Sequence, residues 1–588
     1  MKKFTFLLSL LLAFVGVTAS AQGLKISGAP EGGNWAANTQ WYLIRMAATD
    51  NWHPNAGYLG TEEANFSDTD LRTDQTATPT TDKGLWCIVG NAADGYKFYN
   101  KGEGTSKVLG IASGGKAKLY DASATDAKAL TFDIASSTYD SFAKCVKCHG
   151  QSDGDYWWNN ANKSGVALCV LGTWKHTDSN VGTRGNAFYF IPVSGVDNAS
   201  TEATAFLQIV NYRDILNRYQ VIPGVATNCA TEKAAWEANM NESTGSAYLN
   251  SAKKYLNNTY YRITNCNSGR TKPVLVAEAT KAAGVEATQK MSNASALWKF
   301  IPFEDRGVKL YNANVGAYLK GLVAPPPAGE DAITPMTDDK TQGGLYNISI
   351  NTSGTVKGFV LRDGDNGRMN MESNGGIDKW EGAGGYYEQV TWTIDVATEL
   401  EVALNAVNGK SYATTYLPVG VSAVKDAKAY SAATPADGQT IMTETANFAK
   451  ETGVLLVSDE AADKAVLTIG DVEGATNTSA LKGTLLAKDI TGAQAKYLVF
   501  GKNKANETEV GFFEPSTTVT SIPANRAFFA DAEGSAIALN FGNVTAVNNV
   551  VAGNANANAP IFDLSGRRVV KAVKGGLYIQ NGKKYIVK

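Results

Sequence analysis

The sequence lacks the short motifs that mark zinc proteases and nucleotide-binding enzymes. It contains no His-Glu-x-x-His, which holds a catalytic zinc ion, and no Gly-x-x-x-x-Gly-Lys-Ser/Thr, which cradles phosphate groups. Histidine is also scarce, with only His53, His149 and His176 present, so a catalytic triad based on one of them would need a nucleophile from elsewhere in the chain. We therefore predict no catalytic residue, no metal and no cofactor.

The sequence also lacks a dominant charge and any long apolar run beyond its N-terminus. Its 54 basic and 56 acidic residues give a formal net charge of −2, which does not attract nucleic acid or acidic lipid. The apolar run Phe6–Val17 is too short to span a bilayer. It follows Lys2 and Lys3 and precedes Ala19-Ser20-Ala21, a pattern that predicts a signal peptide over residues 1–21. The prediction is an exported protein with no membrane span.

The residues that are abundant predict a mainly β protein. With 58 glycines, 57 aromatic residues and only 16 prolines, the chain suits many short strands joined by turns. An internal repeat is visible: residues 85–100 align without a gap on residues 297–312, and six of the sixteen positions are identical. The flanking strand patterns extend this repeat to two modules, over residues 28–196 and 257–398. Because strands and turns alternate at short spacing, each module is expected to be a barrel or a sandwich.

The repeated unit of an aromatic strand, a turn, Leu-Trp and Gly-x-Lys-x-Tyr-Asn resembles the ricin-type β-trefoil modules of secreted bacterial proteins. In that family the tryptophan belongs to a Gln-x-Trp pattern. Here the glutamine is replaced, because the chain has GLW at Trp86, ALW at Trp298 and QVTW at Trp392. The resemblance implies two tandem β-trefoil-like modules. It also implies carbohydrate binding, with glycans or glycoproteins as partners.

The remaining segments predict a spacer, a third β region and a tail. Residues 200–256 carry apolar side chains at helical spacing and are expected to form a short helical hairpin between the modules. Residues 400–545 read as a β-sandwich and are similar to C-terminal modules of secreted Bacteroidetes proteins. Residues 561–588 resemble the C-terminal sorting domain of type IX secretion, and Asn581-Gly582 is typical of a hairpin turn. That resemblance implies the secretion machinery as a partner and a secreted or outer-membrane cell-surface location.

The pentapeptide CVKCH has the spacing of a c-type haem attachment site, with Cys145, Cys148 and His149 as the haem residues. We disfavour haem because aligning residues 142–149 with residues 359–366 places no cysteine or histidine at the same positions of the second module. A local disulfide or free thiols are the preferred alternatives. Zinc is disfavoured because a structural zinc site takes four ligands and only three lie together.

Two aromatic and polar segments have the chemistry of a sugar site, since rings stack on sugars and Asp or Asn binds hydroxyl groups. Strand alternation leaves at most one of Trp157 and Trp158 free, and core packing of both segments is the competing interpretation. The leading hypothesis is a non-catalytic carbohydrate-binding protein. The alternatives are a glycan hydrolase whose paired carboxylates meet only in space, a c-type haem protein and a structural host-interaction protein. The candidate ligand residues are Asp155, Trp157, Trp158, Asn159, Asn160, Asn374, Asp378 and Trp380.

Overall fold

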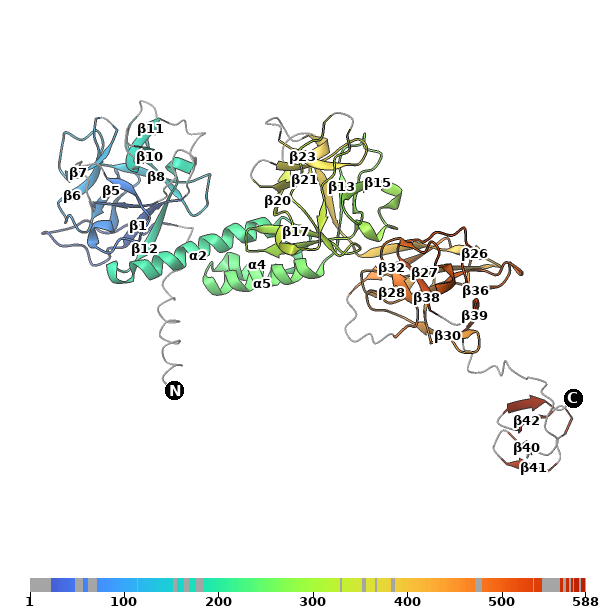
Figure 1. Cartoon of the computed structure of the whole chain (residues 1–588). Coiled ribbons are helices and arrows are strands. Elements are labelled where there is room, and N and C mark those ends of the chain that lie inside the picture. Colours follow the sequence, from blue (N-terminus) through green and yellow to red (C-terminus); the bar gives the residue numbers. More distant parts are fainter. Residues whose placement is uncertain are drawn as a thin grey trace.

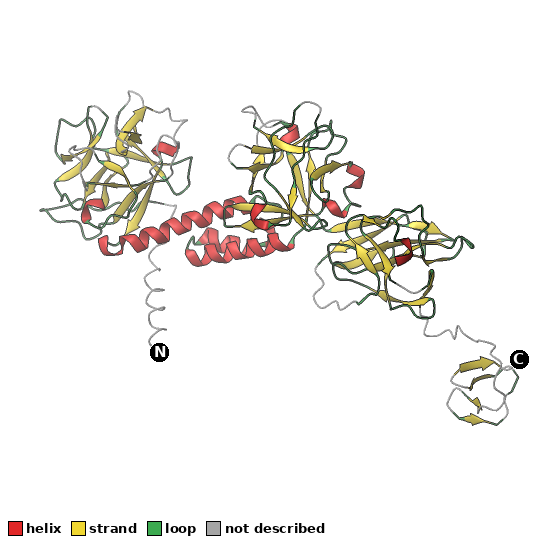
Figure 2. Cartoon of the chain, in the orientation of Figure 1, coloured by secondary structure: helices red, strands yellow, loops and turns green. Residues whose placement is uncertain are grey.

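The chain is mainly β, and in the part that the structure describes its α-helices are confined to one segment between two β modules (Figure 1, Figure 2). The computed structural model contains no described helix that is long and apolar enough to cross a membrane. The predicted signal peptide and the Asn581-Gly582 turn lie outside the described residues. Those residues are 23–47, 57–61, 71–113, 115–151, 156–162, 169–175, 184–327, 330–351, 356–364, 367–381, 387–470, 478–531, 534–541, 561–563, 567–570, 573–574, 576–580 and 583–586.

Module 1 consists of twelve described strands arranged as three units of four. They are β1 (Trp41–Met46), β2 (Tyr58–Gly60), β3 (Arg72–Gln75), β4 (Trp86–Asn91), β5 (Gly95–Asn100), β6 (Lys107–Ile111), β7 (Ala117–Asp121), β8 (Phe132–Ser136), β9 (Lys144–Cys148), β10 (Tyr156–Asn162), β11 (Cys169–Lys175) and β12 (Phe188–Val193). The first strand of each unit pairs with its fourth: β1 with β4, β5 with β8 and β9 with β12. The pairs β4–β5, β8–β9 and β1–β12 close these six strands into a barrel. The other strands form the hairpins β2–β3, β6–β7 and β10–β11.

Module 2 repeats this connectivity strand for strand. Its described strands are β13 (Tyr261–Asn265), β14 (Val274–Ala277), β15 (Ala282–Val285), β16 (Trp298–Phe303), β17 (Gly307–Asn312), β18 (Ala317–Leu319), β19 (Met336–Thr337), β20 (Tyr346–Asn351), β21 (Gly358–Asp363), β22 (Gly367–Met371), β23 (Ile377–Trp380) and β24 (Trp392–Val396). The barrel strands are β13, β16, β17, β20, β21 and β24. The hairpins are β14–β15, β18–β19 and β22–β23. The duplication therefore covers the pairing pattern of the whole module.

Each four-strand unit has a buried aromatic residue at the start of its fourth strand, at the position where that strand pairs with the first strand. Each of the six rings is at most 1% exposed. Where the ring is tryptophan, its Nε1–H donates to a carbonyl of the second strand in the unit, at 3.0 Å in all three cases. The repeated Leu-Trp motif is therefore a core element that also ties a hairpin to the barrel. The six residues are Trp86, Phe132, Phe188, Trp298, Tyr346 and Trp392.

The repeated Tyr-Asn that closes the aligned block is also structural. The Asn100 side-chain amide donates to the Lys83 carbonyl at 2.8 Å, and that of Asn312 donates to the Ser295 carbonyl at 2.7 Å. Both acceptors lie in short 3₁₀ turns that lead into the Leu-Trp strands, η2 (Asp82–Gly84) and η6 (Ala294–Ala296). Both asparagines are fully buried. Their role is to hold the turn in place, so this motif does not mark a ligand site.

The segment between the modules is a cluster of four helices, where we expected a simple hairpin. Its elements are α2 (Val196–Gln220), α3 (Val225–Asn228), α4 (Ala230–Ala238) and α5 (Glu242–Asn258). Helix α2 runs from module 1 to module 2 and packs on β12 of the first and on β17 and β20 of the second (Figure 1). Helix α5 packs on α2 and on β16. The helices are thus a brace that contacts both barrels.

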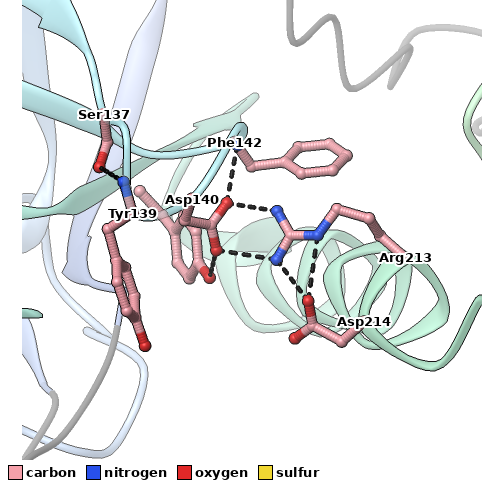
Figure 3. A network of polar contacts seen from close by, with 7 residues as sticks. Ser137, Tyr139, Asp140, Phe142, Arg213 and Asp214 are labelled. Atoms are coloured by element: carbon pink, nitrogen blue, oxygen red, sulfur yellow. Dashed lines mark hydrogen bonds and ion pairs between the residues drawn. The ribbon is translucent and has the colours of Figure 1, made fainter. Parts of the chain in front are cut away.

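A buried polar network joins module 1 to helix α2 (Figure 3). Both nitrogens at the end of the Arg213 guanidinium donate to the Asp140 carboxylate, which also accepts from the Tyr189 hydroxyl at 2.6 Å and from the Phe142 amide at 2.8 Å. Arg213 also donates to Asp214, and its guanidinium carbon lies 4.8 Å from the centre of the Phe142 ring. The Asp140 carboxylate therefore has partners from its own β8–β9 loop, from strand β12 and from the helix.

The C-terminal β region packs directly against module 2. Its core includes Tyr260 and Leu297 of that module, and the Asn525 side-chain amide donates to the side-chain oxygen of Asn314 at 2.7 Å. The last four described strands belong to the tail and form a separate sheet, while the strands before them belong to the C-terminal β region. The strands are β25 (Glu399–Ala403), β26 (Asn405–Val407), β27 (Lys410–Thr415), β28 (Val421–Lys425), β29 (Lys428–Ala432), β30 (Gln439–Thr445), β31 (Val454–Ser458), β32 (Lys464–Ile469), β33 (Lys482–Thr484), β34 (Lys488–Asp489), β35 (Tyr497–Lys502), β36 (Val510–Phe513), β37 (Ser521–Ile522), β38 (Arg526–Ala530), β39 (Ala536–Asn540), β40 (Ile561–Phe562), β41 (Arg568–Val569), β42 (Leu577–Gln580) and β43 (Lys583–Ile586).

Candidate functional site

The predicted site residues fall on the last hairpin of each module, which we call hairpin 1 (β10–β11) and hairpin 2 (β22–β23). Trp157 pairs with Trp174 in hairpin 1, as Arg368 pairs with Trp380 in hairpin 2. The segment DYWWNN therefore begins hairpin 1 on its first strand, whereas Asn374–Trp380 reaches the second strand of hairpin 2. We expected the two segments to occupy matching places; the hairpins match but the strands do not.

Both tryptophans of hairpin 1's first strand are buried, so neither is available to a ligand. Trp158 is 0% exposed, and its ring lies 4.8 Å from the Phe98 ring, centre to centre, inside the barrel core. Trp157 is 4% exposed and packs on Cys145 on the other face of the strand. Core packing, the competing interpretation, applies to both. Asn159 is half-buried, while Asp155 and the Asn160 side chain lie outside the described residues.

The exposed aromatic of hairpin 1 is Trp174, which the sequence analysis did not select. It is 61% exposed, although its cross-strand neighbour Trp157 is buried. Leu171 on the same strand points into the core, and period-two alternation from Leu171 places Trp174 on the opposite face. This alternation is the sequence pattern from which the exposure of Trp174 could have been predicted. Through the strand register, Trp174 corresponds to Trp380 and Asn159 to Asn370.

Hairpin 2 buries a carboxyl group in contact with an amide and a second carboxyl. Asp378 is 0% exposed and Asn370, its cross-strand neighbour, is 1% exposed. The Asn370 side-chain amide donates to Asp378 at 2.8 Å and to Glu372 at 2.6 Å. One nitrogen atom therefore bridges the two carboxyl groups. All three side chains leave the same face of the hairpin, because Met369 and Met371 alternate with them and enter the core.

Several buried polar atoms around Asp378 have no partner in the protein. They include acceptors on Asp378 (Oδ2) and Asn370 (Oδ1) and donors on Trp380 (Nε1) and Arg270 (Nε). Buried polar atoms are nearly always hydrogen-bonded, so the partners of this group are supplied by water or by the hydroxyl groups of a ligand. The sequence analysis selected Asp378 and Trp380 but missed Asn370, Glu372 and Arg270. Those residues come from other strands and loops, and no local pattern marks them.

Burial raises the pKa of the Asp378 carboxyl group to about 6. The negative charge of Glu372 raises it further, whereas the hydrogen bond from Asn370 and the charge of Arg270 oppose the rise. The group consequently changes its charge near pH 6 and carries a proton below that pH.

This pKa predicts that the protein loses stability as the pH rises from 4 to above 6. The native state binds the Asp378 proton more tightly than the unfolded chain does, so the stabilisation is complete below the ordinary pKa of 3.8 and is lost as pH passes 6. The loss is expected to reach about 3 kcal/mol at most. Urea unfolding between pH 4 and 7 measures it. The same pH slope in the wild type and in Asp378→Asn would contradict the assignment.

Aromatic side chains lie beside the polar group. The Trp380 and Tyr387 rings meet edge to face with centroids 6.0 Å apart, and Tyr387 is 47% exposed. Asn374, another predicted ligand residue, instead holds the turn: its amide donates to Asp331 at 2.7 Å, and its oxygen accepts from the Gly376 backbone at 2.9 Å. Hairpin 2 therefore combines a half-buried ring pair with buried, unpaired acceptors and donors.

The two thiols of CVKCH point to opposite faces of β9, which does not fit a haem bound through both. Cys148 lies in the barrel core with Val146, whereas Cys145 packs on Trp157 on the other side. Both are fully buried and free, and burial raises the pKa of Cys148 to about 12. The geometry likewise rules out a disulfide between them. Free thiols, one of the two preferred alternatives, are what the structure contains.

The module alignment around β9 must be shifted by two residues. Lys144 pairs with Phe188 in module 1, and Phe359 pairs with Trp392 in module 2. Residue 144 therefore corresponds to residue 359, and Cys148 corresponds to Asp363, where the gap-free alignment had placed residue 142 opposite 359. The conclusion that the second module has no thiol or histidine at these positions is unchanged.

His149 forms a pair with Asp133, with 2.7 Å between the imidazole Nδ1 and the carboxylate. The residues that follow, 150–154, have the spacing Gly-x-Ser-x-Gly of a hydrolase nucleophile turn, which the sequence analysis overlooked. Such a turn joins a strand to a helix. Here the next described element is the strand β10, and Ser152 lies outside the described residues. The connection thus differs from the one that this motif requires.

Comparison with known proteins adds little. No protein-family model matches the chain, and no curated protein matches it. Among solved structures, the chain is similar to a GlcNAcα1-4Gal-releasing endo-β-galactosidase from Clostridium perfringens. The two are 11% identical over 63% of this chain and 70% of that chain, with a TM-score of 0.19. A likeness at this TM-score establishes neither a shared fold nor a shared function.

Proposed function

We propose that the chain is a non-catalytic carbohydrate-binding protein and that hairpin 2 carries its principal site. The observation that supports this is the set of buried, unpaired acceptors and donors on Asp378, Asn370, Trp380 and Arg270. A sugar hydroxyl both donates and accepts, so neighbouring hydroxyl groups satisfy a carboxylate and an N–H at the same time. A single-sign ligand such as a metal ion would satisfy only the acceptors. The Trp380–Tyr387 pair supplies the apolar surface on which a sugar ring stacks.

We propose further that both modules are β-trefoils of the ricin type. Three four-strand units, six barrel strands and three hairpins in each module support this arrangement. The recurrence of a buried aromatic residue at the start of every fourth strand supports it as well. The signal-peptide pattern and the sorting-like tail support a secreted or outer-membrane cell-surface location, with the secretion machinery engaging residues 561–588.

The test of the proposed function is a glycan array probed with the full chain and with Asp378→Asn. Asparagine keeps the size of the side chain and removes the negative charge, so the fold is expected to persist. Loss of a charged hydrogen bond to a sugar hydroxyl is expected to weaken binding ten- to hundredfold, since such bonds contribute about 1.5–3 kcal/mol. Affinities for the bound oligosaccharide are measured by calorimetry at pH 7.5, where Asp378 is ionised.

The matched control is Asp363→Asn, in the same module. The Asp363 carboxyl accepts from the Leu322 backbone at 2.6 Å, and asparagine keeps that acceptor. This variant is expected to bind as the wild type does. Equal binding by Asp378→Asn and the wild type would show that hairpin 2 is not the binding site. An array on which the wild type binds no glycan would contradict the proposed function.

One observation favours glycoside hydrolysis as a second candidate. Glu372 and Asp378 both contact the same nitrogen atom of Asn370, so their carboxyl groups lie close together, and the raised pKa of Asp378 suits a general acid. Turnover of chromogenic glycosides that disappears in both Asp378→Asn and Glu372→Gln would establish this activity. The binding function instead predicts no turnover with any of these substrates.

A further inference from the structure

Trp174 on hairpin 1 has no role in the site described above, and its exposure is unusual. It is 61% exposed, whereas its cross-strand neighbour Trp157 is buried and its counterpart in hairpin 2, Trp380, is half-buried. The strand register makes it the counterpart of Trp380, and it makes Asn159 the counterpart of Asn370. Hairpin 1 thus presents a ring and an amide on the same face where hairpin 2 presents its ring and amide. Equivalent groups on equivalent elements favour the same ligand chemistry.

The two hairpins also lie on the same side of the molecule. In Figure 1, β10 and β11 of module 1 and β23 of module 2 stand on the side away from α2, α4 and α5. The helices cover the opposite ends of the barrels, where α2 packs on β12, β17 and β20. A flat or extended ligand approaching from the open side would therefore meet both hairpins.

Helix α2 fixes the distance between the modules. Towards its middle, Phe206 packs on Tyr189 of module 1 with ring centres 5.7 Å apart, and in its C-terminal half Arg213 forms the buried network with Asp140 of the same module. At its C-terminal end, the Tyr219 hydroxyl donates to the Gly307 carbonyl of module 2 at 3.3 Å, and Tyr219 is 1% exposed. The helix has 25 residues and is about 37 Å long. Because the helix packs on β12 of module 1 and on β17 and β20 of module 2, it holds the two modules, and with them the two hairpins, in a fixed relative position.

We propose that the chain binds repeating glycans through two sites at once, with hairpin 2 as the stronger site and hairpin 1, centred on Trp174, as the weaker one. The proposal rests on the carbohydrate-binding function. Its ligand class is a glycan displayed in many copies, as in a polysaccharide or a glycan-coated surface, because only such a ligand reaches both hairpins. Fixed spacing converts the second contact into an intramolecular step, so a weak site adds greatly to the total affinity.

The two sites are unequal for a structural reason. Gly172 stands in hairpin 1 at the register position that Asp378 occupies in hairpin 2. At this position hairpin 1 therefore has no carboxylate to anchor a hydroxyl group, and among its described side chains it presents the Trp174 ring and the Asn159 amide. A site of this kind contributes little with a single short sugar and is revealed only by a multivalent ligand.

The experiment compares two probes on the full chain. One probe is the oligosaccharide that the wild type binds on the array, free in solution, and the other is the same oligosaccharide carried in many copies on albumin. The wild type is expected to bind the conjugate at least tenfold more tightly than the free sugar. Trp174→Ala is expected to abolish that gain and to leave the affinity for the free sugar within twofold. Asp378→Asn weakens the binding of both probes.

The control for removing an exposed apolar side chain is Ile441→Ala, in the C-terminal β region, where Ile441 is 55% exposed. It is expected to retain the full gain. A gain that survives in Trp174→Ala overturns the two-site proposal and leaves the carbohydrate-binding function intact. A loss of free-sugar affinity in Trp174→Ala would also overturn it, because hairpin 1 would then be the principal site. Absence of binding to either probe by the wild type overturns both proposals.

Discussion

Asp140→Ala is expected to lower the free energy of unfolding of module 1 and helix α2 by about 3–5 kcal/mol. The substitution removes the buried partner of a buried guanidinium group, since the side chains of Arg213 and Asp140 are only 10% and 6% exposed. Arg213 then keeps only the Asp214 carboxylate, which is 48% exposed. It also leaves the Tyr189 hydroxyl and the Phe142 amide without their acceptor. A buried charge that loses its buried partner costs more than the lost attraction alone, because the charge has also lost its water.

Calorimetric unfolding of the full chain measures this effect, with hydrogen exchange identifying which transition contains β12 and α2. The control is Asp459→Ala, which breaks an exposed ion pair with Lys410 and is expected to cost less than about 1 kcal/mol. A similar small effect of both substitutions would show that the network does not hold module 1 to the helix. Loosening of this contact would also reduce the gain with multivalent glycan, since the spacing of the hairpins depends on it.

Lowering the pH changes the contributions of Asp140 and of Asp378 to the stability of the protein in opposite directions. Burial alone would raise the pKa of Asp140, but the hydrogen bonds from Arg213 and Tyr189 hold it below its ordinary value of 3.8. Its stabilising contribution is therefore present above that pH and is lost only in stronger acid. Asp378 has a raised pKa, so its contribution is present at low pH and is lost as the pH passes 6. The chain is consequently expected to be most stable between these two limits, in mildly acidic solution.

The sequence predicted features that repeat along the chain and missed those that depend on distant partners. The aligned Leu-Trp and Tyr-Asn pairs identified the internal repeat, because every unit has a buried ring and because Asn100 and Asn312 each hold a turn of their module. The partner of Arg213 lies 73 residues earlier in the chain, and no local pattern connects the two. The expected helical hairpin failed for the same reason: the length of α2 reflects its contacts with two barrels, not its own propensity.

The candidate site shows the same division between local and distant information. The combination of an aromatic ring with Asp or Asn selected Trp380 and Asp378. Strand alternation did not decide between Trp157 and Trp158, because both faces of β10 are covered. One face of β10 meets the barrel core and the other meets Cys145, so Trp157 and Trp158 are both buried. Asn370 and Arg270 join Asp378 only through strand pairing and loop placement. Their place in the candidate site therefore could not be predicted from the sequence alone.

Trp392→Ala is expected to destabilise module 2 by about 3–5 kcal/mol. The ring is fully buried, and its removal leaves a cavity that the closed barrel cannot fill by local collapse. It also removes the hydrogen bond from the indole to the Met369 carbonyl, which ties hairpin 2 to the barrel. Urea unfolding of the full chain, followed by near-ultraviolet circular dichroism, measures the change.

Trp392→Phe separates the two contributions, because phenylalanine fills much of the volume but cannot donate to Met369. It is expected to cost less than the alanine substitution while still weakening sugar binding, since β22 carries Asn370 immediately after Met369. Trp174→Ala is the matched control, an alanine substitution of an exposed tryptophan that is expected to change stability by less than about 0.5 kcal/mol. Equal destabilisation by Trp174→Ala and Trp392→Ala would contradict the assignment of core and surface. If Trp392→Phe left sugar binding unchanged, hairpin 2 would not depend on its tie to the barrel.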